Sequence, residues 1–178
     1  WYIERFRRMA AEGDDLAGEA RFLDAMLARG SRVLDAGCGT GRLSGALHER
    51  GHHVVGVDVD PALIDAAQAD HPGPRYVVTD LAELALDEDP FDAALLAGNV
   101  LVFVASGSER TVLRRVAEHV RPDGVVATGF ATDRGYQIDT FDRDCSAAGL
   151  VLEHRFATWD LRPWRTDAPW AVTVLRRR

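Results

Sequence analysis

Short apolar runs alternate along the chain with stretches in which apolar residues recur every three or four positions. Runs that are apolar at nearly every position are typical of parallel strands buried on both faces, and the spaced pattern is typical of helices packed on a sheet. This alternation predicts an α/β fold. The strands are expected at residues 33–34, 54–58, 75–79, 91–97, 125–130, 150–159 and 170–175.

The first 29 residues have helical spacing instead. Ile3, Phe6 and Met9 recur at helical intervals, and a second apolar stripe runs from Leu16 to Leu27. Glycine follows at position 30, and glycine is the residue that most often ends a helix. A helical segment is therefore expected before the first strand.

The last two strands, at 150–159 and 170–175, are joined by a short segment that contains Pro163 and Pro169. A parallel return would need a crossover of about a dozen residues or more. The short link therefore predicts an antiparallel pair at this end of the sheet.

Composition limits the partners that the chain can bind. With 178 residues, of which 47% are hydrophobic and 28% charged, a single globular domain is expected. The net charge of −7 argues against a broad nucleic-acid surface. The longest apolar run, 93–105, is too short to span a bilayer, so no membrane partner and a cytoplasmic location are expected. Cys38 and Cys145 show no metal-ligand spacing, so no metal site is expected.

The most informative stretch is 32–43, where a strand ends in Asp35 and Gly37, Gly39 and Gly41 follow at alternate positions before a helix begins. Glycines in such a turn allow unusual dihedral angles and let a ligand approach the backbone. In an open parallel sheet, ligands bind at the carboxyl ends of the strands. This turn is therefore the predicted ligand site.

The turn departs from the dinucleotide fingerprint, which needs glycine or alanine at its sixth position. That position is Arg42 here, or Ser44 if the frame is shifted by two residues. The carboxylate of Asp35 would also repel a pyrophosphate, but it would suit a ligand with an ammonium group. A nicotinamide-dependent oxidoreductase therefore stays a less favoured alternative.

Acidic residues also follow the next two predicted strands. Asp58 comes 17 residues after Gly41, close to the spacing at which Rossmann-type folds place an acid that binds the ribose hydroxyls. Asp80 ends the third strand. Three carboxylates at neighbouring strand ends are a more specific signal than the glycines alone.

These features closely resemble the first motif and strand ends of the Rossmann-like (class I) S-adenosylmethionine (SAM) methyltransferases. SAM carries a cationic amino group and no phosphate, which agrees with the acid before the turn. The resemblance covers about residues 31–175 and implies a seven-stranded mixed sheet of order 3-2-1-4-5-7-6, with strand 7 antiparallel and helices on both faces. It implies one SAM-binding domain over 1–178, in which 1–30 form a helical cover and 31–178 the Rossmann-like core. A helix packed on the edge of the sheet is the alternative for the N-terminal segment.

The resemblance also implies which residues hold SAM and the product S-adenosylhomocysteine (SAH). In the family, an acid at the position of Asp80 takes the adenine amine, and the amide of the next residue, Leu81, meets the ring. The cofactor-binding residues expected on this basis are Asp35, Ala36, Gly37, Cys38, Gly39, Gly41, Asp58, Val59, Asp80, Leu81, Ala97, Gly98 and Asn99.

The expected reaction is an in-line attack of an acceptor on the sulfonium methyl group, and the compact chain favours a small-molecule acceptor. Asn99 has two possible roles: it orients the acceptor or SAM, or it only stabilises a turn. No catalytic base is assigned; if the reaction uses one, Tyr136 or a residue of the N-terminal segment is where it is expected. A SAM-binding protein without activity is the other alternative. The candidate acceptor residues are Tyr2, Asn99, Phe103, Tyr136 and Trp164. The acceptor and the oligomeric state do not follow from the sequence.

Overall fold

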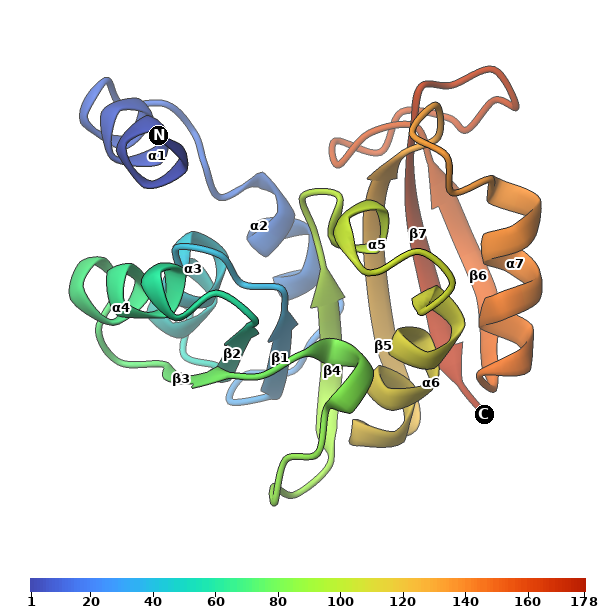
Figure 1. Cartoon of the computed structure of the whole chain (residues 1–178), viewed down its shortest axis with the longest axis horizontal. Helices are drawn as coiled ribbons and strands as arrows, with labels where there is room; N and C mark the ends of the chain where they lie inside the picture. The colour runs from blue at the N-terminus through green and yellow to red at the C-terminus, as the bar shows by residue number, and fades with distance from the viewer.

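The computed structural model describes residues 1–178, except for the side chain of Tyr2. Seven strands form one sheet in the order β3-β2-β1-β4-β5-β7-β6 through the middle of the molecule (Figure 1). The predicted strand order is confirmed. The strands are β1 (Arg32–Ala36), β2 (His53–Asp58), β3 (Arg75–Val78), β4 (Phe91–Leu96), β5 (Val120–Ala131), β6 (Leu150–Phe156) and β7 (Trp170–Arg177).

Strand β7 is antiparallel to both of its neighbours, β5 and β6, whereas β1 to β5 pair in parallel. The predicted antiparallel strand is therefore confirmed. Because β5 and β7 run in opposite directions, Trp170 at the start of β7 lies opposite Ala131 at the carboxyl end of β5.

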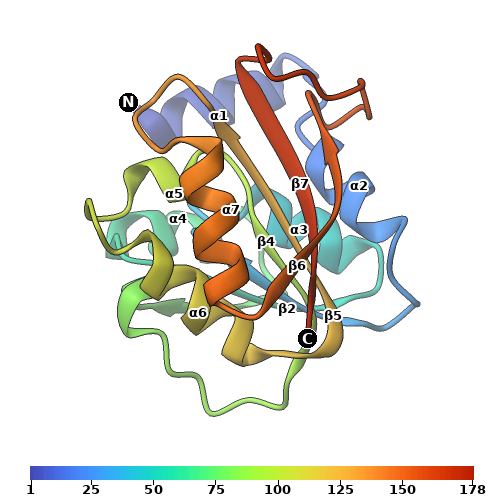
Figure 2. The ribbon, with the colours of Figure 1, turned by 90° about the vertical axis from the view of Figure 1, so that its right-hand side faces the viewer.

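Helices cover both faces of the sheet, as predicted. Figure 2 shows α5, α6 and α7 on one side of the strands and α2 and α3 on the other. Helix α4 packs beside β2 and β3, and the short η1 helix follows β3. The helices are α1 (Tyr2–Ala11), α2 (Gly18–Asp24), α3 (Arg42–Glu49), α4 (Pro61–Asp70), η1 (Leu81–Glu83), α5 (Val100–Phe103), α6 (Glu109–His119) and α7 (Ile138–Ala147). None of these described helices is long and apolar enough to cross a membrane.

The core consists of two apolar clusters, one on each face of the sheet. In β4, Ala94 and Leu96 face the cluster under α6 and α7, while Ala93 and Leu95 face the cluster under α2 and α3. From Ala93 to Leu96 this central strand is buried on both faces, which leaves no exposed position for a polar side chain. This explains the nearly continuous apolar run in its sequence.

Several element boundaries differ from the prediction. The N-terminal helical segment consists of two helices separated by residues 12–17. Strand β5 begins at Val120 rather than at 125, with Asp123 at a positive φ of 62°. Strand β6 ends at Phe156 rather than at Trp159. The chain turns there, and the Trp159 ring packs on Gly129 and edge-on against Phe22 with ring centroids 5.2 Å apart.

Phe141 of α7 provides a test of this packing. Its ring is fully buried, with its centroid 5.1 Å from that of Phe130 and 6.1 Å from that of Tyr136. We expect Phe141→Ala to lower the free energy of unfolding by about 3–5 kcal/mol, because the cavity left behind adds to the lost burial. Chemical denaturation of the two proteins measures this difference.

The matched control is Phe103→Ala, the same change at a ring that is 73% exposed. We expect this variant to unfold within about 0.5 kcal/mol of the unchanged protein. Equal losses in the two variants would contradict the assignment of the core to α6 and α7.

Candidate functional site

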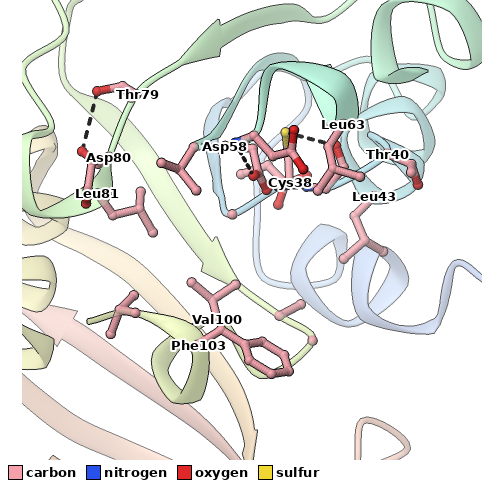
Figure 3. Close-up of a pocket in the computed structure, with 18 of the residues that line it drawn as sticks. Cys38, Thr40, Leu43, Asp58, Leu63, Thr79, Asp80, Leu81, Val100 and Phe103 are labelled. Atoms are coloured by element: carbon pink, nitrogen blue, oxygen red, sulfur yellow. Dashed lines mark hydrogen bonds between the residues drawn. The ribbon is translucent and has the colours of Figure 1, made fainter. Parts of the chain in front are cut away.

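A cavity of about 500 Å³ lies at the carboxyl ends of the parallel strands. Figure 3 shows Val100 and Phe103 of α5 across the cavity from Asp58 and Leu63, with Asp80 and Leu81 toward one end. Its volume falls within the usual range for small-molecule sites. The predicted cofactor residues that line it are Asp35, Gly37, Cys38, Gly39, Asp58, Val59, Asp80, Leu81, Ala97 and Gly98.

Asp35 lies deep in this cavity, on β1, and is only 2% exposed. The Ser44 hydroxyl on α3 donates a hydrogen bond to its Oδ2 at 2.6 Å. Burial raises the pKa of Asp35 to about 6, because the charged form loses its hydration, although the bond from Ser44 and the charge of Arg42 oppose the shift. Burial therefore disfavours the ionised form of Asp35, and a nearby cation would stabilise that form.

The glycine turn has the unusual dihedral angles that the sequence indicated, and the surrounding protein adds a second constraint. Gly37 and Gly41 have positive φ angles of 81° and 77°. A Cβ on Gly37 would lie 2.5 Å from a methyl carbon of Val100, and one on Gly41 would lie 2.6 Å from the Tyr76 hydroxyl. Glycine is therefore required at both positions by the surrounding protein as well as by the backbone conformation.

Asp58 at the end of β2 fastens this turn. Its Oδ2 accepts a hydrogen bond from the Gly39 amide at 2.9 Å, and its Oδ1 accepts one from the Asp60 amide at 3.0 Å. The amides of Gly37 and Cys38 donate to the Val57 carbonyl, at 2.8 and 2.9 Å. Each carboxylate oxygen can accept a further bond, so Asp58 can hold the turn and bind a hydroxyl in the cavity.

At the end of β3, Asp80 lines the cavity next to Leu81. Its Oδ1 caps η1 by accepting a hydrogen bond from the Ala82 amide at 2.8 Å. Val59, which follows β2, also lines the cavity and is 64% exposed. A carboxylate between apolar side chains suits a planar ligand with an N–H group at its edge.

The tip of β4 contributes Ala97 and Gly98 to the cavity, and α5 contributes Phe103. Asn99 is not among the described residues that line it. Its Oδ1 instead accepts a hydrogen bond from the Ala131 amide at 2.7 Å, and its own amide donates to the Gly129 carbonyl at 3.2 Å. With a positive φ of 70° at the start of α5, Asn99 stabilises a turn, as one of its two predicted interpretations stated.

Two other predicted acceptor residues lie away from the described cavity lining. Tyr136 is buried between Phe130 and Phe141, and its hydroxyl donates to Asp144 at 3.0 Å. Burial and that carboxylate raise the pKa of Tyr136, so it is not a candidate base. The loop before α7 turns this ring into the core, so the structure does not bring Tyr136 to the described lining of the cavity.

Trp164 stacks on the Arg155 guanidinium, whose carbon lies 5.6 Å from the ring centroid, and it is not among the described lining residues either. The side chain of Tyr2 lies outside the described residues. Two predicted cofactor residues, Ala36 and Gly41, are not among the described lining residues. Ala36 is fully buried in the core on one face of the sheet, and Gly41 packs against Tyr76 and Ala67.

Some lining residues were missed in the sequence, among them Thr40, Arg42 and Leu43 in the first turn of α3 and just before it. Arg42 had a detectable signal. A cation in the first turn of a helix opposes the helix dipole, so an arginine directly after the glycine turn needs a compensating partner.

The electrostatics of the cavity favour a cation. Asp35, Asp58, Asp60 and Asp80 all line it, while the guanidinium of Arg42 is already paired with Glu19. A pyrophosphate would meet these carboxylates directly, whereas an ammonium or sulfonium group would be attracted. Within the described residues, no cluster of side chains could hold a metal ion.

A second hollow of about 640 Å³ lies between α2 and the strands β6 and β7. Its walls include Phe22, Met26 and Trp159, and its Arg21 is paired with the exposed Asp15. It lies apart from the strand ends that carry the acids. The cavity at the strand ends is therefore the candidate site.

The family comparison assigns residues 33–124 to a model described as "Methyltransferase domain". Curated relatives include a malonyl-[acyl-carrier protein] O-methyltransferase of Salmonella typhimurium, 36% identical over 95 residues, and a ribosomal protein L11 methyltransferase of Shewanella halifaxensis, 33% identical over 122 residues. The alignments cover 53% and 67% of this chain but only 37% and 41% of those proteins. The chain thus spans well under half the length of these relatives.

Solved structures match over a larger share. A TehB-like SAM-dependent methyltransferase from Corynebacterium glutamicum is 41% identical, with a TM-score of 0.95 over 99% of this chain and 96% of that one. The SAM-bound magnesium protoporphyrin IX methyltransferase of Synechocystis, 21% identical, shares the fold with a TM-score of 0.71 over 90% of this chain and 76% of that one. The family model, which matches more than half of the residues, and the Corynebacterium structure show that the chain belongs to the class I SAM-dependent methyltransferases, with SAM as its cofactor.

Proposed function

We propose that this protein transfers the methyl group of SAM to a small-molecule acceptor bound at the α5 side of the cavity. The observation that carries the proposal is the convergence of Asp35, Asp58 and Asp80 from three neighbouring strand ends on one cavity. These carboxylates suit the amino group, the ribose hydroxyls and the adenine amine of a single ligand.

Each strand end would bind one part of the cofactor. Asp58 would accept the ribose hydroxyls while it keeps its bonds to the turn, and Asp80 with Leu81 would hold the adenine. Asp35 would face the amino group from below the glycine turn. The cofactor supplies an electrophilic methyl group on a sulfonium centre. The chain contributes binding and alignment, which by themselves accelerate a bimolecular transfer strongly.

The acceptor would enter past α5. Phe103 lines the cavity although most of its ring is exposed, and Val104 and Ala105 continue an apolar wall beside it. Such a wall favours an acceptor with an apolar or aromatic body. Two of the relatives carry names that specify acyl-carrier-protein-linked and ribosomal protein substrates, so a protein acceptor is the second candidate.

We also propose that residues 1–30 serve as a cover for a core formed by 31–178. Helix α1 lies toward the carboxyl side of the sheet, above α3 and α4 (Figure 1). Arg7 of α1 forms an ion pair with Asp70 at the end of α4, with N–O distances of 2.8 and 3.1 Å. The cover would thus close the cavity from the side opposite to α5.

Isotope-labelled SAM tests the reaction. Incubated with the protein and a panel of small amines, thiols, phenols and carboxylic acids, SAM should yield SAH together with a labelled acceptor. Tight SAH binding without turnover on small molecules or on protein acceptors would favour a SAM-binding protein without activity. Calorimetry that detected NAD binding and no SAH binding would refute the proposal.

We expect Asp58→Ala to weaken SAH binding by about 10–100-fold, since hydrogen bonds to a charged group contribute about 1.5–3 kcal/mol. Titration calorimetry measures the dissociation constant. Asp65→Ala is the matched control, because Asp65 is an exposed acid on the neighbouring α4. An unchanged affinity for SAH in Asp58→Ala would contradict the proposal that Asp58 binds the ribose hydroxyls.

Asp35 should make SAH binding depend on pH. Its pKa of about 6 in the free protein means that it is mostly protonated at pH 5. A ligand ammonium group beside it favours the ionised form, so binding must release this proton, and affinity rises with pH up to about 6. We expect affinity to be about tenfold lower at pH 5 than at pH 7, because one pKa unit equals 1.36 kcal/mol.

The control for this pH dependence is Asp35→Asn, whose amide can still accept the bond from Ser44. Its SAH affinity should be lower at pH 7 and nearly constant between pH 5 and 7. Parallel pH profiles for the two proteins would show that Asp35 does not face the amino group.

A further inference from the structure

Arg42 occupies a position that a helix disfavours. It is the first residue of α3, directly after Gly41, and the first turn of this helix contains no acidic residue. A cation here opposes the positive end of the helix dipole. The surrounding contacts must therefore compensate for its charge.

These contacts come from the N-terminal segment. The Arg42 guanidinium donates to both Glu19 carboxylate oxygens, at 2.6 and 3.1 Å, and to the Leu16 carbonyl at 2.5 Å. Its central carbon also lies 5.4 Å from the centroid of the Phe6 ring. One side chain thus joins α1, the link between the helices, and α2.

The pair is shielded from solvent. The Arg42 and Glu19 side chains are 18% and 17% exposed, whereas the Arg21–Asp15 pair at the other side of α2 is 51% and 63% exposed. Salt and water weaken a shielded pair much less than an exposed one. The bidentate geometry also fixes the orientation of α2 relative to the first turn of α3.

Helix α1 depends on contacts of this kind. It contains ten residues, and isolated helices shorter than about 12 residues are marginal in water. Its contacts with the rest of the protein include the Phe6–Arg42 stacking and the Arg7–Asp70 ion pair. Loss of the Arg42 cluster would therefore remove one of these two attachments of α1.

We infer that Arg42 is a positioning residue that latches the N-terminal segment, residues 1–24, onto the turn of the cofactor cavity. Arg42 itself lines that cavity, so the latch connects the cover directly to the site. The effect of the latch on ligand binding rests on the proposed function. The latch itself is a property of the free protein.

A charge swap tests the latch. We compare Arg42→Glu, Glu19→Arg and the double variant by amide hydrogen exchange of α1 and α2 without ligand, and by calorimetry with SAH. Each single variant should speed exchange in α1 by about tenfold or more and weaken SAH binding several-fold, and the double variant should restore most of both, since coupled residues are not additive. Arg21→Glu, which breaks the exposed pair on the same helix, should change neither.

The two measurements separate the alternatives. Wild-type exchange rates in both single variants would overturn the latch. Weaker SAH binding with unchanged exchange would also overturn it, because Arg42 would then act on the ligand directly. If the unchanged protein failed to bind SAH, the proposed function would fail, while hydrogen exchange would still decide on the latch. Should a reversed charge prevent folding, Glu19→Gln removes the charge with little change of shape and gives the same comparison.

Discussion

The two hydrogen bonds that Asp58 accepts from the Gly39 and Asp60 amides organise the whole site. They join the turn after β1 to the start of α4 at the end of β2. Together with the bonds from the Gly37 and Cys38 amides to the Val57 carbonyl, they offset the conformational freedom that the glycines of this turn lose on folding. The same carboxylate faces the cavity, so the group that shapes the site is also available to a ligand.

A second constraint acts from the other side of the turn. Gly37 approaches Val100 so closely that no larger residue fits between β1 and the start of α5. Asn99 fixes α5 in turn by bonding across to Ala131 at the end of β5. The two walls of the cavity are therefore set by contacts of the Val100 and Asn99 side chains with the backbone at neighbouring strand ends. Side chains that would select an acceptor, such as Phe103, project from this frame.

Burial of charge explains how such a site can prefer a cation. Asp35 lies where water cannot solvate it, with one hydroxyl from Ser44 as its partner, and its pKa is raised accordingly. A buried carboxylate of this kind destabilises the free protein at neutral pH and is relieved by a ligand of opposite charge. The positive charge of Arg42 reduces the energetic cost of the buried Asp35 carboxylate, and the same guanidinium forms an ion pair with Glu19. Through this ion pair, Glu19 of the N-terminal segment contacts a cationic side chain that lines the cavity.

The sequence alone determined the α/β class, the antiparallel last strand and the strand ends that carry Asp35, Asp58 and Asp80, because these follow from the apolar pattern, from turn residues and from short spacings. The resemblance to a known family supplied the full strand order. Only the tertiary structure decided what the side chains of Tyr136, Asn99 and Arg42 contact. Their partners lie on other elements, in Asp144, Ala131 and Glu19. The direction of a side chain at a strand or loop end depends on how those elements pack, and the local sequence pattern does not encode that packing.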